Sequence, residues 1–284
     1  GRYLSRADTT KRYLTDPEVM RLHERRLARR VAGEELVRRQ FARDPLRDAQ
    51  RQAHLFVIAE PGAAPDDLLV PLLDAGQWQQ FGVELLQRAI HNSDLNTQLR
   101  DGNVSPFSPD MDTLQSFDLR ARGFALTSSG FGPGRTLAEN AVNDETVAEL
   151  EVANSGALHA YLSRLSDNIG DDSQQYLFDS APVAYVRRTL AITTYLCEKI
   201  GYFGVWTIGV GATGLKGVTS YLHYQRGMGH GPVYDESDYI RSVETTYVDI
   251  RDHPAQIANR LLGPLLRSLR VHGVFTGALS DPAE

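Results

Sequence analysis

Residues Ala181–Ile200 read APVAYVRRTLAITTYLCEKI and form the clearest helical pattern in the chain. Val183, Val186 and Leu190 recur at the three- to four-residue spacing that places side chains on one helical face. Gly201 follows directly and can take the left-handed conformation that ends many helices. The segment therefore predicts a core helix, in which we expect Leu190 to be buried against a sheet.

The same helix carries the single cysteine, Cys197, next to Leu196, a second position that we expect to be buried. One cysteine excludes an internal disulfide and any zinc site built mainly from cysteines. A free cysteine behaves as a small apolar side chain, so Cys197 is predicted to be a buried structural thiol. This cysteine usage favours a cytoplasmic location, and no apolar run is long enough to span a membrane.

Segments typical of strands lie on both sides of this helix. They are short, apolar or alternating, and they end at glycine, proline or polar residues. The predicted strands cover residues 54–60, 116–128, 147–153, 157–165, 203–210, 218–223 and 239–250. Further helices are predicted at 65–73, 77–91 and 253–271, and the last of these has a leucine face that should dock on the same body.

Short links between neighbouring strands favour antiparallel pairing. The elements therefore predict an α+β fold with a mixed, mainly antiparallel sheet and packed helices, preceded by an Arg-rich helical arm. Charge divides the chain similarly: the first 52 residues hold 14 of the 30 lysines and arginines against eight acids, and the rest carries a net charge of −12. We assign residues 1–52 to the arm, or to the end of an upstream domain, and residues 53–284 to an acidic body.

The arm contains two helix-start signals. The stretch Thr15–Glu18 (TDPE) predicts a capping box with proline in the first turn, and the helix can run to about Ala42. Asp44 and Pro45 predict the cap and first residue of a second short helix that ends near Gln52.

Arginines of the arm helix repeat every four residues and share a face, which predicts a surface for phosphate groups. The candidate nucleic-acid-binding residues are Arg2, Arg6, Lys11, Arg12, Arg21, Arg25, Arg29 and Arg30. A solvated helix face with internal ion pairs is the alternative, since Glu34 and Glu35 each precede an arginine by four residues.

Residues Gly209–Gly214 match the spacing of a dinucleotide-binding loop, G-x-G-x-x-G. That loop must be followed by a helix, whereas the residues after Gly214 are typical of a strand. We therefore predict a turn that joins two antiparallel strands, and no cofactor.

The chain's one histidine and carboxylate cluster extends from His223 to Asp238. Its spacing matches no known metal-ligand motif, so no metal site is predicted, and a mobile lid near a binding site is the alternative. The candidate ligand-binding residues of this region are Gly211, Gly214, His223 and His230. No P-loop, kinase or hydrolase motif is present, so catalytic residues remain unknown and the sequence does not show whether the protein is an enzyme.

The first residues, GRYLSRADTTKRYLTDPEVMRLHERR (1–26), combine an aromatic strand ending in arginine, a short turn and a Thr-x-x-Glu helix start. This segment resembles the last strand and exit helix of an AlbA-like, Schlafen-related DNA-binding domain. The resemblance implies DNA binding. It does not imply nuclease activity, because the acidic cluster of Schlafen-type nucleases would lie upstream of Gly1.

Together these features predict the C-terminal portion of a nucleic-acid-associated regulatory or bacterial defence protein, whose body senses a ligand or mediates assembly. One alternative is a small-molecule-binding protein or enzyme that uses residues 209–230. Another is an oligomerisation module, in which the arm helix pairs with its own copy. We expect a homo-oligomer, a possible nucleic-acid partner and no membrane association.

Overall fold

The computed structural model describes residues 4–7, 10–13, 15–47, 51–105, 111–129, 131, 137, 146–169, 173–227 and 231–281. Its strands are β1 (Leu4–Ala7), β2 (Thr10–Tyr13), β3 (His54–Pro61), β4 (Ser116–Arg120), β5 (Gly123–Thr127), β6 (Ala148–Ala153), β7 (Leu158–Leu162), β8 (Ser166–Asn168), β9 (Gln175–Leu177), β10 (Val205–Thr213), β11 (Thr219–Ser220) and β12 (Tyr239–Thr246). Its α-helices are α1 (Asp16–Ala42), α2 (Val70–Asp74), α3 (Trp78–Ile90), α4 (Ser93–Asp101), α5 (Ser180–Ile200), α6 (Tyr221–Gln225), α7 (Tyr247–Asp252) and α8 (Pro254–Ser268). In the described residues, 3₁₀ helices cover Met111–Thr113 and His272–Ala278.

A seven-stranded sheet forms the centre of the body, in the order β12-β10-β3-β7-β6-β5-β4. Every neighbouring pair in it is antiparallel. A smaller sheet, β11-β9-β8, includes one parallel pair, β11 with β9. The fold is therefore α+β with a mainly antiparallel sheet, as the sequence predicts.

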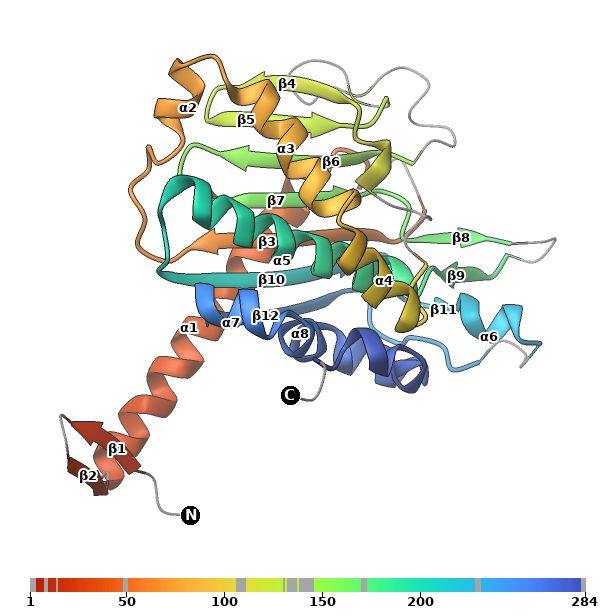
Figure 1. Ribbon diagram of the computed structural model, residues 1–284. Coiled ribbons are helices and arrows are strands. Elements are labelled where there is room, and N and C mark those ends of the chain that lie inside the picture. Colours follow the sequence, from red (N-terminus) through yellow and green to blue (C-terminus); the bar gives the residue numbers. More distant parts are fainter. Residues whose placement is uncertain are drawn as a thin grey trace.

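Helices α3, α4, α5 and α8 cover one face of the large sheet (Figure 1). Leu190, Leu196 and Cys197 of α5 are fully buried, which confirms the predicted orientation of this helix. Gly201 ends it with φ at 69°, the left-handed conformation that the sequence predicts. Buried Leu261 and Leu265 also confirm that the closing helix, α8, docks on the body.

Helix α1 crosses the opposite face over β12, β10 and β3 (Figure 1). Its predicted capping box is present, with the Thr15 N–H donating to Glu18 Oε2 at 2.9 Å. Val37 and Phe41 of its second half are buried against the sheet, whereas residues 20–25 and 27–32 of its first half are exposed. The β1–β2 hairpin lies at the free end of this projecting half.

The predicted turn at Gly209–Gly214 is wrong. Gly209 and Gly211 lie inside β10, which pairs with β12 and β3 rather than with residues 218–223. A Cβ atom on Gly209 would lie 2.6 Å from Val37 Cγ2, and one on Gly211 would lie 2.5 Å from Phe41 Cε1. These glycines therefore allow α1 to approach the sheet closely, and only Gly214, with φ at 71°, turns the chain away.

Three other strand predictions need correction. Residues 116–128 are two strands, since the chain reverses in a two-residue turn at Ala121 and Arg122, between the end of β4 and Gly123 at the start of β5. Residues 218–223 form the two-residue β11 and then the start of α6, whose N-terminus is capped by Ser220 Oγ. The strand predicted at 239–250 stops at Thr246, which caps α7 with its hydroxyl group.

The predicted helices also differ in places. In the described residues 44–47, the second short helix of the arm does not form: the Asp44 carboxylate accepts hydrogen bonds from the Leu46 N–H at 3.0 Å and from the Tyr161 hydroxyl at 2.9 Å, and residues 45–47 form a turn. The helix predicted at 65–73 is reduced to α2. Helix α4 was not predicted, and only Leu95 and Leu99 of its nine residues are buried.

The contact between α1 and β10 gives a direct stability prediction. Gly211→Ala should destabilise the protein by about 1–3 kcal/mol, because its methyl group must displace Val37 and Phe41 from a close-packed site. Chemical denaturation measures the change. Gly273→Ala is the control, because a Cβ atom there meets nothing within 4 Å. Equal stability of the two variants would contradict close packing of α1 on β10.

Candidate functional site

The arginines of the projecting half of α1 are the first candidate site. Arg21, Arg25, Arg29 and Arg30 are all exposed. Arg29 forms an ion pair with Glu244 of β12, and Arg30 Nε lies 3.9 Å from Glu34 Oε1. Within the described part of the chain, Arg21 and Arg25 form no hydrogen bond or ion pair. These two guanidinium groups are therefore available to a partner.

Three of the other predicted arm residues, Arg6, Lys11 and Arg12, lie in the hairpin at the same end of the molecule. Arg6 of β1 and Lys11 of β2 pair in register across the hairpin, and Arg12 follows in β2. Arg2 lies outside the described residues. The structure thus brings the hairpin and the projecting half of α1 together, away from the body (Figure 1).

The structure does not gather the other candidates around one cavity. Gly211 lies beneath α1, and Gly214 follows the end of β10. His223 is on α6, where its Nε2 lies 3.1 Å from the carbonyl oxygen of Leu269. His230 lies outside the described residues.

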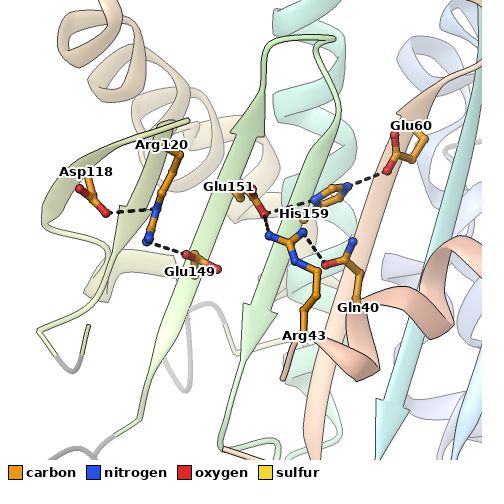
Figure 2. A network of polar contacts seen from close by, with 8 residues as sticks. All are labelled: Gln40, Arg43, Glu60, Asp118, Arg120, Glu149, Glu151 and His159. Atoms are coloured by element: carbon orange, nitrogen blue, oxygen red, sulfur yellow. Dashed lines mark hydrogen bonds and ion pairs between the residues drawn. The ribbon is translucent and has the colours of Figure 1, made fainter. Parts of the chain in front are cut away.

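A row of charged side chains crosses the part of the sheet face that α1 leaves uncovered (Figure 2). We call this set the polar row: Arg43, Glu60, Asp118, Arg120, Glu149, Glu151 and His159. It was not recognised in the sequence, although the alternation in β6, where Glu149 and Glu151 flank buried Leu150, places both acids on one face of the sheet.

His159 lies between two carboxylates at the centre of the polar row. Its Nε2 is 2.6 Å from Glu60 Oε1, and its Nδ1 is 3.4 Å from Glu151 Oε2. Arg43 Nη2 donates to the same Glu151 oxygen at 2.8 Å. Burial alone would lower the pKa of His159, but the hydrogen bonds to Glu151 and Glu60 outweigh it and raise the pKa to about 9. The imidazole is therefore a cation at neutral pH and is unsuited to act as a general base.

Glu151 has the complementary shift. Burial would raise its pKa, but the hydrogen bond from His159 and the charge of Arg43 lower it to about 2. A second cluster lies beside it, where Arg120 contacts Glu149 Oε1 at 3.0 Å and Asp118 Oδ2 at 3.1 Å. Three cations thus lie among four carboxylates along the row, and their mutual contacts hold these side chains, most of them largely buried, in one geometry.

A groove of about 810 Å³ lies over one end of the polar row. Its walls include Arg43, Glu60, Glu151 and His159, together with Arg122 from the turn between β4 and β5. Among the described residues, no group of histidine, cysteine or acidic side chains is arranged to hold a metal ion. The groove can therefore offer hydrogen bonds and charges of both signs.

No protein-family model, curated protein or solved structure matches the chain. None of the helices that the structure describes is both long and apolar enough to cross a bilayer. Function must therefore be argued from the geometry of these surfaces.

The position of His159 predicts a pH-dependent contribution to stability. Its folded pKa of about 9 exceeds the ordinary value of 6.5. Its protonation therefore stabilises the fold fully below about pH 6.5, and this contribution disappears as the pH rises through about 9. His159→Gln should be less stable than the wild type by about 2 kcal/mol near pH 6, and the difference should shrink towards about pH 10.

Denaturant titrations across this pH range measure the difference. His91→Gln, which changes an exposed histidine, is the control and should follow the wild-type profile. If the stability difference between His159→Gln and the wild type were the same at every pH, it would contradict a His159 imidazolium stabilised by Glu60 and Glu151.

Proposed function

We propose that the protein associates with nucleic acid through the projecting half of α1 and the adjoining hairpin, and that its acidic body acts in ligand sensing or assembly. One observation carries the proposal: Arg21 and Arg25 are exposed, with no acidic partner among the described residues. The second half of the same helix is anchored by Val37 and Phe41, so the arginines are held on a rigid support.

Arginine is well suited to a nucleic-acid backbone. Its planar guanidinium group stays charged and can donate two hydrogen bonds to one phosphate group. The acidic residues Asp16 and Glu18 lie in the first turn of α1, where Glu18 is engaged in the capping box. Contacts of this kind carry no base information, so binding should be independent of sequence.

The negative charge of the body indicates which surface nucleic acid would contact. Residues 53–284 carry a net charge of −12, which repels a polyanion. Nucleic acid would therefore contact the arm and leave the sheet, the polar row and the helical layer free. This division of charge supports a body that performs a separate task, in keeping with the resemblance of residues 1–26 to a DNA-binding domain.

Mixed-sequence duplex DNA tests the proposal in a salt series. Changing Arg21, Arg25, Arg29 and Arg30 to alanine should weaken binding and reduce the slope of log K against log salt by about 3.6, because each of the four phosphate contacts contributes about 0.9. The charge-matched control replaces four exposed residues of the body: Arg122, Lys216, Arg226 and Arg267. Wild-type binding without a salt slope, or equal binding by both variants, would contradict the proposal.

Exposed apolar side chains on the projecting half of α1 favour self-association as a second candidate function. Met20, Leu27 and Val31 share one side of the helix and are 59%, 53% and 52% exposed. Such a stripe is self-complementary when two copies meet about a two-fold axis. The two surfaces differ, since the arginines at positions 21 and 25 lie to one side of this stripe.

Leu27→Glu tests self-association, because it places a charge in the middle of the stripe. Sedimentation equilibrium should show a wild-type dimer and a monomeric variant. Val83→Glu, at an exposed apolar position of α3, is the control and should remain a dimer. A wild-type protein that is monomeric at all concentrations would exclude this candidate.

A further inference from the structure

A cavity of about 270 Å³ lies in the helical layer, on the side of the sheet opposite α1. Its lining residues come from the end of α3, the start of α4, the middle of α5 and the junction of α7 with α8 (Figure 1). It shares no residue with the arm or with the polar row. Any ligand of this cavity would therefore bind independently of the proposed nucleic-acid interface.

Arg187 of α5 is the distinctive residue of this cavity. It is only 4% exposed, yet it donates hydrogen bonds to uncharged acceptors, the Ala278 carbonyl oxygen at 2.5 Å and Gln98 Oε1 at 2.7 Å. Its Nε is buried without a partner among the described residues. Burial lowers the pKa of Arg187, and the more distant charge of Asp281 opposes that shift. The structure therefore holds a desolvated cation whose charge is only partly compensated.

Further positive charge surrounds Arg187. Arg88 lies on the wall of the cavity, with its guanidinium carbon 5.1 Å from the ring centroid of Tyr195. Arg251 lies on another wall, where its Nε is 2.7 Å from Asp252 Oδ1. Two carboxylates, those of Asp94 and Glu198, line the cavity beside the three arginines, and Asp252, which pairs with Arg251, is not part of the lining.

The N-termini of two helices add partial positive charge at this cavity. Asn92, the N-cap residue of α4, and Pro254, the first residue of α8, both line the cavity. Helix N-termini carry partial positive charge and favour anions. Leu95, Ala191 and Ile250 provide an apolar part of the wall, so the cavity combines a cationic region with a surface for hydrocarbon.

We propose that this cavity binds the oxyanion of a small organic molecule, a carboxylate or a phosphate monoester, with Arg187 as its buried anchor and Arg88 and Arg251 at its walls. Paired guanidinium donors suit both oxyanions. The volume is slightly below the range of about 300–1,000 Å³ that is typical of small-molecule sites, which limits the ligand to a compact metabolite.

Isothermal titration calorimetry of the whole chain tests the site with three probes at constant ionic strength: inorganic phosphate, phenyl phosphate and benzoate. Saturable binding of phenyl phosphate or benzoate at one site per chain is expected, and the tighter of the two identifies the oxyanion. Inorganic phosphate should bind more weakly, because it leaves the apolar wall uncovered. No saturable heat from any probe up to about 10 mM would overturn the proposal.

Variants connect the binding to the cavity. Arg88→Gln and Arg251→Gln change exposed residues and should each weaken binding about tenfold, because a charge-assisted hydrogen bond is lost. Arg122→Gln, on the opposite face of the sheet, is the control and should bind as the wild type does.

Arg187→Lys keeps the charge and removes the planar fork, so it should weaken binding further if the variant folds. If it does not fold, the Arg88→Gln/Arg251→Gln double variant decides the outcome. Unchanged affinity in that variant, with a native melting temperature, would show that the anion binds elsewhere and would overturn the proposal.

Discussion

The close approach of α1 to β10 is the constraint on which the arrangement of this protein depends. Gly209 and Gly211 leave a strip of β10 without side chains, and Val37 and Phe41 of α1 fill it. Side chains at either glycine would separate helix and sheet. This contact fixes the direction in which the first half of α1 projects, and it determines which strands remain uncovered. The projection of the basic arm and the position of the polar row thus both follow from this one packing contact.

The two faces of the sheet differ in how they are covered and in how their charges are compensated. The face under α3, α5 and α8 is dry, and its helices exclude water from the leucine-rich core. Of the helices that the structure describes, only α1 covers the other face, and β6 and β7 present polar groups there. Opposite charges around His159 match one another closely. In the helical layer, the positive charge of Arg187 is less fully compensated, because its hydrogen bonds go to uncharged acceptors.

The sequence predicted the elements that rely on local signals. Helices α1, α5 and α8 follow from their periodicity and from caps such as Gly201 and Thr15. Contacts between distant segments could not be predicted in this way. The glycines of β10 resembled a turn because the helix that packs on them lies far away in the sequence. The polar row likewise depends on strand neighbours, which a single sequence does not reveal, and the cavity around Arg187 is lined by five separate helices.

The strand order has a consequence for folding during synthesis. Strand β3 is made early, but it lies between β10 and β7, so the middle of the sheet remains incomplete until β10 has left the ribosome. The contact from the Ser242 hydroxyl to the Arg30 carbonyl joins residues 212 positions apart. Such long-range contacts slow folding, because the chain must lose much entropy before they form. The arm would therefore remain without its full support until β10, which receives Val37 and Phe41, and β12, which contacts Arg30, have both been synthesised.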